Sequence, residues 1–548
     1  MDILPIKTMQ LTLRIATVGG LSLALLLGAC STEDDLIEER NADNPLPTAE
    51  PPPTGTPGTA DFTKYVAIGN SLTAGFMDAA LYNSGQQNAF PVILAQQFRI
   101  NGLGGGAFNV PDINSENGFN TSLNNGSQPG GTILGRLVLN IDSADIEATI
   151  GELIAPYPPE QRAQLNSFGV PGVRAIDAPA PSYGQANPFF GRFASSAGAS
   201  LLGDAARAQG TFFTVWLGSN DVLGWALSGG SAPDGEVDPA AQATNPATLT
   251  SVASFTQAYQ AIIGSMLATP EAKGVAINLP PVTLLPFFRA VPYNPVPLNQ
   301  ANADALNAGY AQYNQGLDGA VALGQITAEE AARRKISFAA PAGNPVVMVD
   351  EDLSAIDLSA TQQLPSGSIV LPKLRQTDST DLLLLSVSPL LGEVLREGGG
   401  PYGLQDPVTD QYVLTRNEQV TLITRLATFN GIIDAIVGST GGRVALLDVN
   451  PVFADIAGLS PVQAAQLAMS PEAQAAADGT RGLLVDGVVL DPSFRPDGIF
   501  SVDGIHPNPK GHAVVANEII RVINDAFDAT IPSIDTTPYR TILTPPPM

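Results

Sequence analysis

The chain has 548 residues but only two histidines, and one of them completes a short acid–base motif. His506 follows Asp503 by one helical turn's spacing in the run Asp503-Gly504-Ile505-His506. An imidazole exchanges a proton near neutral pH, and a carboxylate can hold the ring in one orientation and one tautomer. The motif therefore predicts a general base with its orienting group, and such a pair requires a nucleophile elsewhere in the chain.

A serine with a suitable local sequence lies near the start of the folded part. The apolar run at residues 65–68 ends in Gly69-Asn70-Ser71-Leu72, a strand-to-turn junction of the kind at which α/β hydrolytic enzymes present a nucleophilic serine. Ser71 is thus the candidate nucleophile. The alternative is that Ser71 only caps a helix that follows the strand, which is a common role for serine.

Acyl transfer also needs hydrogen-bond donors for the oxyanion that develops on the substrate carbonyl. A second strand-like run is followed by Gly-Ser-Asn-Asp at residues 218–221, where the side-chain amide of Asn220 can donate. Another candidate is the segment 166–172, because a glycine at Gly172 lets a backbone N–H approach a substrate closely. The structural alternatives are that Asn220 and Asp221 cap the next helix and that Gly172 only forms a turn.

The elements that must position these residues can be read from the apolar pattern. Near-continuous apolar runs predict strands that are buried on both faces, at residues 64–68, 211–217, 275–278 and 444–449. Apolar side chains at helical spacing predict helices at residues 253–268, 419–437 and 512–527. This alternation favours an α/β sandwich with a parallel sheet. The second histidine, His512, is interpreted as the start of the last helix and not as the base.

Charged residues are few and mostly acidic, with 26 Lys and Arg against 52 Asp and Glu. Such a chain repels nucleic acid, whose binding depends on the neutralisation of phosphates by Lys and Arg. We therefore expect no nucleic-acid partner. The acidity is interpreted as a solubility feature or as the sign of a salty habitat.

The first thirty residues are typical of an export signal. Lys7 and Arg14 precede an apolar stretch at residues 15–27, which is too short for a comfortable membrane span. The sequence Leu-Gly-Ala-Cys then ends at Cys30, the single cysteine of the chain, and resembles a bacterial lipoprotein signal that is cut before the cysteine. We expect residues 1–29 to be removed and Cys30 to carry the lipid. The alternative is a free cysteine in an uncleaved leader.

Residues 30–60 are predicted to form a tether, because they are first acidic and then rich in proline. The acidic run Glu33-Asp34-Asp35 beside the cysteine resembles the surface-export signals of Bacteroidetes lipoproteins, and a generic solvated linker is the alternative. The expected location is that of an exported bacterial lipoprotein, held in the outer membrane through the lipid on Cys30, with the cell surface as one possible face.

Four segments, in this order, resemble the SGNH hydrolases, also called the GDSL esterase/lipase family. The family's Gly-Asp-Ser-Leu block matches residues 69–72, its second-block glycine matches Gly172, its Gly-x-Asn-Asp block matches residues 218–221, and its Asp-x-x-His block matches residues 503–506. The resemblance covers these blocks and the strand–helix framework, which is half of the chain. It implies a three-layer α/β/α sandwich with a mainly parallel, flavodoxin-like sheet that carries long insertions.

The resemblance also implies roles for single residues. Ser71 would be the nucleophile, with Asp503 and His506 completing a triad. The N–H groups of Ser71 and Gly172 and the side chain of Asn220 would form the oxyanion hole. The implied activity is the hydrolysis of a carboxylic ester, in a lipid, an acylated carbohydrate or a small molecule, through an acyl-enzyme. This chemistry requires no metal and no organic cofactor.

One residue departs from the family pattern, since Asn70 stands where the first block has aspartate. An amide there keeps a hydrogen-bonding group and loses a charge. The departure leads to an alternative function, a non-catalytic surface-binding lipoprotein built on the same frame.

The chain is thus divided into a signal peptide (1–29), a lipidated tether (30–60), a hydrolase domain (61–530) with an insertion at about residues 290–415, and a proline-rich tail (531–548). The insertion is interpreted as a cap over the site. Within it, Thr327 and Glu330 stand at capping-box positions, which predicts a helix. The acidic run at residues 350–352 lacks the spacing of a calcium loop and is interpreted as a solvated turn.

Two further patterns leave alternatives open. The apolar runs at residues 284–288 and 382–391 fit the lining of an acyl-chain channel and ordinary core packing equally well. Trp225 is interpreted as a packed aromatic residue, with substrate contact as the alternative.

Overall fold

The computed structural model describes residues 53–124, 131–140, 145–358, 370–460, 463, 482–494 and 498–542. The chain divides into two units, Met1–Pro53 and Thr54–Met548, and the second holds nearly all of the described residues. The expected signal peptide, Cys30 and the acidic start of the tether lie outside the described residues.

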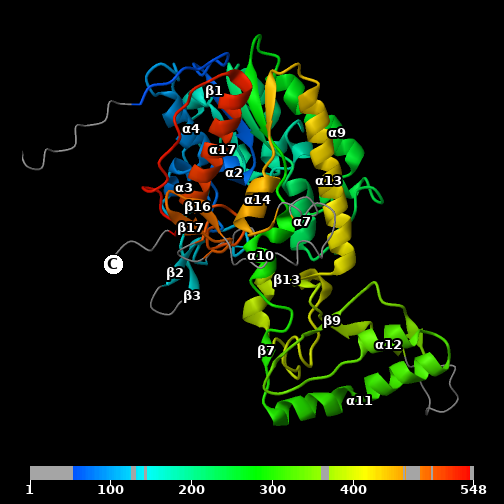
Figure 1. Cartoon of the computed structure of the whole chain (residues 1–548). Coiled ribbons are helices and arrows are strands. Elements are labelled where there is room, and N and C mark those ends of the chain that lie inside the picture. Colours follow the sequence, from blue (N-terminus) through cyan, green and yellow to red (C-terminus); the bar gives the residue numbers. More distant parts are fainter. Residues whose placement is uncertain are drawn as a thin grey trace, which may run out of the picture. The chain divides into compact units, whose positions relative to one another are not determined.

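A five-stranded parallel sheet forms the centre of a mixed α/β fold (Figure 1). In chain order its strands are β1 (Tyr65–Gly69), β4 (Ser167–Gly169), β5 (Phe212–Trp216), β6 (Lys273–Ile277) and β15 (Val444–Leu447). Their order across the sheet is β15-β6-β5-β1-β4, and every neighbouring pair is parallel. The strands are thus ordered 2-1-3-4-5, as in flavodoxin-like sheets, which bind ligands beyond the carboxyl ends of the strands where the winding reverses.

Helices cover both faces of this sheet, because successive side chains of a strand point to opposite faces. Tyr65 of β1 belongs to one apolar core and Val66, the next residue, to the other. The core around Tyr65 includes α4 (Phe90–Phe98) and α17 (Pro509–Phe527). The core around Val66 includes α6 (Leu201–Arg207), α9 (Val252–Met266) and α13 (Arg416–Gly438). Figure 1 shows α4 and α17 on one side of the sheet and α9 and α13 on the other.

The helix α13 is, among the described residues, the one helix that is long and apolar enough to cross a membrane. Its side chains Leu422, Phe429 and Ile433 are buried in the core around Val66. We therefore interpret α13 as a core helix, for which the same apolar composition is expected.

The predicted elements are present close to their expected bounds. The four predicted strands are β1, β5, β6 and β15, and the three predicted helices are α9, α13 and α17. The short edge strand β4 was not predicted, because three residues are too few to show a strand pattern. The sheet is connected by further short elements: α2 (Ser71–Ala74), α3 (Asn83–Gln87), α5 (Pro188–Gly191), α7 (Asn220–Leu227), α8 (Ala241–Thr244), α10 (Pro286–Arg289), α14 (Asn450–Ile456), and the hairpins β2 (Leu134–Asn140) with β3 (Asp145–Ile150) and β16 (Leu483–Val485) with β17 (Val488–Leu490).

The expected insertion builds an apolar core of its own, with members between Leu298 and Leu404. Its helices are α11 (Gln300–Ala322) and α12 (Ala328–Arg334). The latter is the helix predicted from the capping box, and the Thr327 hydroxyl accepts a hydrogen bond from the N–H of Glu330 at 3.0 Å. Its strands are short: β7 (Val296–Pro297), β8 (Gly343–Asn344), β9 (Val347–Val349), β10 (Ile356–Asp357), β11 (Val370–Leu371), β12 (Leu374–Gln376), β13 (Leu382–Leu383) and β14 (Val413–Leu414).

Residues at both ends of the predicted domain pack against it. At the amino end, the N–H of Gly55 donates to the carbonyl of Asn101 at 3.0 Å and that of Thr59 to the carbonyl of Phe527 at 2.8 Å. At the carboxyl end, Ile531 and Ile534 are buried in the core of α17. The larger unit, which begins at Thr54, thus includes residues on both sides of the predicted range 61–530.

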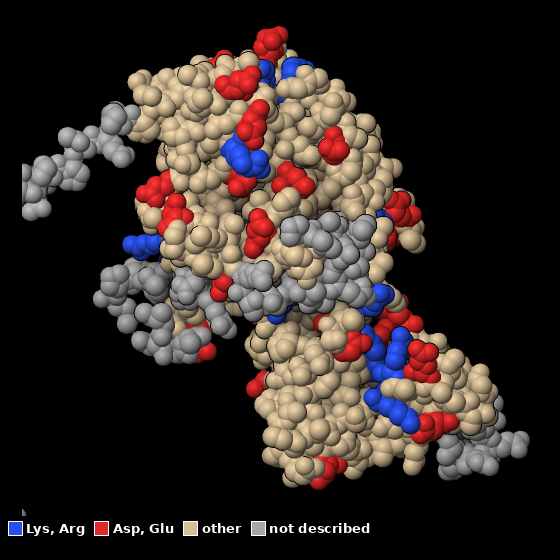
Figure 2. Space-filling model, viewed as in Figure 1, with Lys and Arg blue, Asp and Glu red and all other residues tan. Residues whose placement is uncertain are grey.

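The surface follows the acidic composition of the chain. On the face drawn in Figure 2, acidic side chains are spread over a mostly uncharged surface, and the fewer basic side chains mostly adjoin acidic ones.

The turn after β1 provides a test of the packing. A Cβ added at Gly69 would lie 2.0 Å from the Thr73 hydroxyl and 2.8 Å from the Trp216 carbonyl oxygen. We expect Gly69→Ala to lower the free energy of unfolding by about 1–3 kcal/mol, as overpacking does. The matched control is Gly264→Ala in α9, where a Cβ meets nothing within 4 Å and where a gain of about 0.5–1 kcal/mol is expected. Urea unfolding of both variants is the measurement, and equal effects at the two positions would contradict the assigned contact.

Candidate active site

The strand β1 ends in a tight turn that presents Ser71 at the carboxyl edge of the sheet. Asn70 is the N-cap of α2, and its side-chain oxygen accepts a hydrogen bond from the N–H of Leu72 at 3.0 Å. Ser71 is the first residue of α2, which ends after one turn at Gly75 in the left-handed conformation. The capping role that was the alternative for Ser71 therefore belongs to Asn70, and the Ser71 hydroxyl is left for another partner.

That partner is His506, which the fold brings across from the far end of the chain. The Ser71 Oγ lies 2.9 Å from the Nε2 of His506, and the His506 Nδ1 lies 2.8 Å from an Asp503 carboxylate oxygen. All three side chains are nearly buried. With Nδ1–H donating to Asp503, the Nε2 of the neutral ring is an acceptor for the Ser71 O–H. The structure thus brings the three residues of the predicted triad into one hydrogen-bonded chain.

The negative charge of Asp503 is held by four donors. Besides the imidazole, one carboxylate oxygen accepts the N–H groups of Ile505 and His506, both at 2.9 Å, and the other accepts the N–H of Ala79 at 2.9 Å. Burial alone would raise the pKa of Asp503, but the charge and hydrogen bonds of His506, with the N–H of Ala79, lower it to about 2. Asp503 is therefore ionised near neutral pH, as an orienting group must be.

A strained turn supplies the donor from Ala79. Asp78 and Ala79 have φ angles of 54° and 60°, a conformation that residues with a Cβ rarely adopt. Met77 and Ala80 flank the turn and exchange two backbone hydrogen bonds, as the ends of a two-residue hairpin turn do. Strain of this kind persists only where the surroundings over-determine the backbone.

The surroundings that hold this turn are polar and buried. The Asp78 carboxylate accepts the N–H of Val502 at 3.2 Å and the hydroxyl of Tyr82 at 2.6 Å, and the Asp78 N–H donates to the Ser501 hydroxyl at 3.0 Å. Asp78 is thereby tied to the segment that carries Asp503. Asp78 was not predicted as a site residue, because no local pattern links the loop after Ser71 to the loop that carries His506. Burial, opposed by the Tyr82 hydrogen bond and reinforced by the charge of Asp503, raises the pKa of Asp78 to about 6.

The second histidine has a structural role, as predicted. His512 is fully buried in α17, where its Nδ1 accepts the N–H of Phe90 at 3.4 Å and its ring stacks on that of Phe90. Burial, with the charge of His506, lowers the pKa of His512 to about 3. His512 therefore stays neutral in the physiological range and has no contact with Ser71.

The three groups expected to bind an oxyanion lie on neighbouring loops. Gly172 has φ of 80°, so the position needs glycine, and in the described part of the chain neither its N–H nor that of Ser71 has a protein acceptor. The Asn220 side-chain N–H₂ donates one hydrogen bond to the carbonyl of Val173 at 2.9 Å, which leaves its second N–H free. Gly172 is a turn residue, as its structural alternative held. Asn220 is the first residue of α7, but its side chain does not cap this helix.

Asp221 holds the loop that carries Gly172. One oxygen of this fully buried carboxylate accepts the N–H of Ala175 at 2.5 Å. Burial, opposed by that hydrogen bond and by the charge of Arg174, raises the pKa of Asp221 to about 7. The loop from residue 170 to residue 175 is thus fastened at Val173 by Asn220 and at Ala175 by Asp221.

A small cavity of about 50 Å³ opens beside Ser71, His506 and Asn220. Its walls are mostly apolar and come from the segments that follow β1, β5 and β6, from α14 and from the histidine loop; they include Trp216, Val282, Leu285, Phe453 and Phe500. Among the described residues, none of the lining comes from the insertion at 290–415. The cap over the site stays a prediction.

Trp225 is packed, whereas the first apolar run is divided between the cavity and the core. Trp225 is buried, and its indole N–H donates to the carbonyl of Ala232 at 2.9 Å. In the run at residues 284–288, Leu285 lines the cavity beside Ser71 and Phe288 is buried in the main core; Leu384 of the second run is also buried there.

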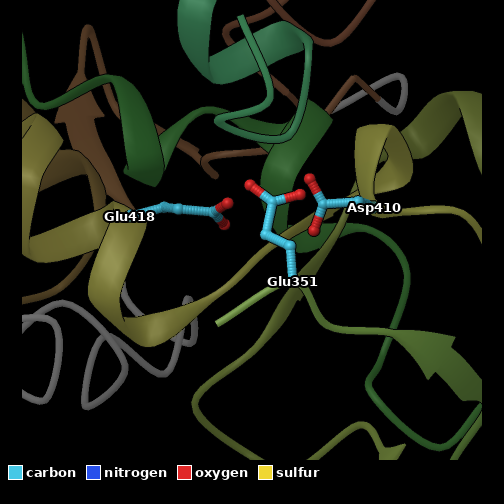
Figure 3. A group of neighbouring side chains, drawn as sticks. All are labelled: Glu351, Asp410 and Glu418. Atoms are coloured by element: carbon cyan, nitrogen blue, oxygen red, sulfur yellow. The ribbon is translucent and has the colours of Figure 1, made fainter. Parts of the chain in front are cut away.

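A second group of carboxylates lies in the insertion and its border (Figure 3). The side chains of Glu351, Asp410 and Glu418 point toward one another, with ligand atoms all within 4.8 Å. Burial and the neighbouring carboxylates raise the pKa of Asp410 to about 8. Burial, opposed by two hydrogen bonds from Thr415, raises the pKa of Glu418 to about 7. The spacing of the three carboxylates is compatible with one shared cation. Protonation of Asp410 and Glu418 near neutral pH relieves their mutual repulsion equally well, and we therefore assign the group no ligand.

Of the acidic run at residues 350–352, interpreted as a solvated turn, Glu351 and Asp352 are exposed residues of a turn, and Asp350 is not. Asp350 is buried and pairs with Arg375 at 2.5 Å, and Arg375 also binds Asp381 at 2.5 Å. Glu351, though exposed, also joins Asp410 and Glu418. The partners come from segments 25 to 67 positions away, so the run itself could not reveal them.

Asp78 provides a pH test of the hydrogen-bonded site. Because its pKa is raised from 3.8 to about 6, its stabilising effect is complete below the unfolded pKa and is lost as the pH rises through 6. Asp78→Asn removes this titration, so the stability of the variant relative to the parent should rise by on the order of 2–3 kcal/mol between pH 4 and pH 7. Urea unfolding at both pH values measures it. Asp525→Asn on α17, with a side chain 73% exposed, controls for the loss of one acidic residue, and a pH-independent difference for Asp78→Asn would contradict the assignment.

Comparison of this chain with protein-family models, with curated proteins and with solved structures found no match. The function must therefore be argued from the geometry of the site.

Proposed function

We propose that the protein is a serine esterase of the SGNH type, as the four sequence blocks suggest. The single observation that carries the proposal is the buried chain of hydrogen bonds from Asp503 through His506 to Ser71. A serine whose hydroxyl hydrogen is accepted by a carboxylate-oriented imidazole is the arrangement that activates serine as a nucleophile. The parallel sheet, with Ser71 and Asn220 just beyond the carboxyl ends of β1 and β5, supports the finer assignment of an SGNH-type fold.

The reaction follows from these contacts. His506 Nε2 takes the proton of Ser71 as Oγ bonds to the ester carbonyl carbon, and Asp503 stabilises the imidazolium that forms. The imidazolium then gives this proton to the alcohol oxygen as the C–O bond breaks, leaving an acyl group on Ser71. His506 next takes a proton from water, the hydroxide releases the acyl group as a carboxylic acid, and Ser71 regains its proton. The cycle is proton-neutral and consumes one water.

Three donors would stabilise the oxyanion in both steps. The N–H groups of Ser71 and Gly172 lack protein acceptors among the described residues, and the Asn220 amide has one N–H to spare. Asn220 is fixed through Val173, so its free N–H is oriented before the substrate arrives, which is the condition for efficient electrostatic stabilisation. Ser71 and Asn220 line the small cavity, and Gly172 precedes Val173, the residue whose carbonyl Asn220 binds.

The replacement of aspartate by Asn70 is compatible with this activity. Asn70 acts through its side-chain oxygen, which accepts the N–H of Leu72. An aspartate oxygen could accept the same hydrogen bond, so the turn that presents Ser71 does not need the charge. This argues for a working esterase over the alternative of a non-catalytic binding lipoprotein.

We also propose that the domain is anchored to the outer membrane of a bacterium by a lipid on Cys30. Support comes from the apolar stretch before Leu-Gly-Ala-Cys and from the proline-rich segment that separates Cys30 from the start of the domain at Thr54. The partners are thus an ester substrate and a membrane, with no nucleic acid.

The two histidines give a matched test of the catalytic assignment. Ser71→Ala and His506→Ala should each lower kcat for a short-chain aryl ester by about 10³-fold or more. His512→Asn keeps an acceptor for the N–H of Phe90 and should retain activity. Steady-state hydrolysis of p-nitrophenyl acetate measures all three. Undiminished hydrolysis by Ser71→Ala would show that the nucleophile is wrong, and ester binding without turnover by the intact protein would favour the non-catalytic alternative.

The anchor is tested by Cys30→Ser. The variant should lose the lipid mass and move from the membrane fraction to the soluble fraction, since serine cannot form the thioether. Mass spectrometry of the intact protein and cell fractionation measure the two effects. A variant that keeps the same lipid mass would refute the anchor without affecting the esterase proposal.

A further inference from the structure

The cavity beside Ser71 has walls that suit a hydrocarbon chain. Ser71, Asn220 and His506 stand in its lining, next to the point where the ester carbonyl carbon would be attacked. Most of the other side chains in its described lining are hydrocarbon, and they include Leu223, Val282, Leu285, Phe453 and Phe500. A polar group would lie against these walls without partners, which is costly. The cavity therefore favours an apolar part of the substrate.

The acyl chain is the part of an ester that this cavity fits. After the alcohol has left, the acyl group stays bonded to the Ser71 Oγ, so its chain must lie beside Ser71 until water releases it. The alcohol leaves with a hydroxyl group, which needs a hydrogen-bonding partner and a path to water. Apolar walls next to Ser71 stabilise a bound hydrocarbon chain and give a hydroxyl group no such partner.

A second cavity adjoins the first. Its volume is about 30 Å³, and it lies among the residues that follow β15, α14 and the first half of α17. Its described lining is apolar except for Glu518 and the indole N–H of Trp216, which already donates to the carbonyl of Asn278 at 3.2 Å. This second cavity thus has the same chemical character as the space beside Ser71.

Five residues line both cavities and therefore form the wall between them: Trp216, Phe453, Phe500, Pro507 and Val515. The ring centroids of Phe453 and Phe500 are 6.2 Å apart, with the planes tilted by 57°, a geometry at which aromatic rings attract each other. Trp216 ends β5 and Pro507 follows His506, so both belong to the frame of the site. The pair Phe453–Phe500 is the part of the wall that can set the depth of an acyl pocket.

The volumes limit the chain on each side of this wall. The cavity beside Ser71 has about 50 Å³, and because a water-sized group needs roughly 10–15 Å³, it holds about three to five non-hydrogen atoms. The second cavity, by the same measure, holds about two or three more. A butanoyl chain therefore fits the first cavity alone, and an octanoyl chain needs both.

We propose that Phe453 and Phe500 set the acyl specificity of the protein: the cavity beside Ser71 takes a short saturated acyl group, and the aromatic pair closes it against the second cavity. This inference rests on the proposed esterase function and names the residues that select its acyl group. Attack by Ser71 on such an ester releases the alcohol, and water then releases the short carboxylic acid from the acyl-enzyme.

The chain-length profile of the parent protein is the first test. Its kcat/KM for p-nitrophenyl butanoate should exceed that for p-nitrophenyl octanoate by about 100-fold, because the longer chain exceeds the cavity. Butyl acetate and octyl acetate vary the alcohol instead, and their values should agree within about threefold. An octanoate value equal to the butanoate value would overturn the short-acyl assignment. A loss that follows the alcohol length would overturn the assignment of the cavity to the acyl chain.

Two variants of the shared wall are the second test. Phe453→Ala opens the wall and should raise the octanoate-to-butanoate ratio of kcat/KM by about tenfold, and Val515→Phe fills the pocket and should lower the butanoate-to-acetate ratio by about tenfold. Both positions are half-buried. Phe108→Ala is the matched control, since Phe108 is also half-buried, stacks on Tyr65 and lies outside both linings. It should change neither ratio.

The outcomes separate this inference from the proposed function. If the parent hydrolyses aryl esters through Ser71 but both wall variants keep the parent ratios, the specificity residues are wrong and the esterase stands. Thermal unfolding followed by circular dichroism shows whether each variant is folded, and the parent profile tests the acyl pocket even if one variant is not. If the parent hydrolyses none of these esters, the esterase proposal fails and the inference fails with it.

Discussion

The buried negative charge of Asp503 is the constraint on which the rest of the site depends. A carboxylate can stay ionised away from water only if donors surround it, and here they come from its own loop, from the His506 ring and from Ala79. The donor from Ala79 requires two consecutive residues with positive φ, and the cost of that turn is offset by the bonds of Asp78 to Tyr82, Ser501 and Val502. The segment that carries Ser71 and Asp78 is thus joined twice to the segment that carries Asp503 and His506. One connection is the Ser71–His506 contact, and the other is formed by the hydrogen bonds of Asp78 and Ala79.

The sheet explains why residues so far apart in sequence meet at one edge. In a parallel sheet all strands point the same way, so the loops after β1, β4 and β5 emerge together. The helix α17 returns antiparallel to the strands, which puts the loop before it, with Asp503 and His506, at the same edge as Ser71.

Much of this arrangement could be predicted from the sequence, for identifiable reasons. Strands buried on both faces leave continuous apolar runs, and helices such as α9 and α17 leave periodic ones. The triad residues were found because serine after a strand and a paired histidine are rare in this chain. The long helix α11 was missed because only Ala303, Tyr313, Leu317 and Ala320 of its residues are buried, which leaves too narrow an apolar stripe.

Features made by long-range contacts could not be read locally. The role of Asp78 depends on a loop more than four hundred positions away, and Asp350 meets Arg375 across two strands of the insertion. The segment predicted as a proline-rich tail, residues 531–548, has no periodicity, yet Asn517 and Asn524 of α17 bind its backbone at Ile534 and Ile531. Side chains of α17 thus make the hydrogen bonds to this backbone that a neighbouring strand would make in a sheet. Composition alone does not reveal such contacts.

The packing of Thr59 against Phe527 fixes where the chain enters the domain. Phe527 ends α17, whose first turn lies beside His506, and a helix of 19 residues is roughly 28 Å long. The chain therefore enters the domain at the amino edge of the sheet, a full helix length from the nucleophile at the carboxyl edge. Changes to the chain before Thr59 would thus act far from Ser71 and leave the access of a substrate to it unobstructed.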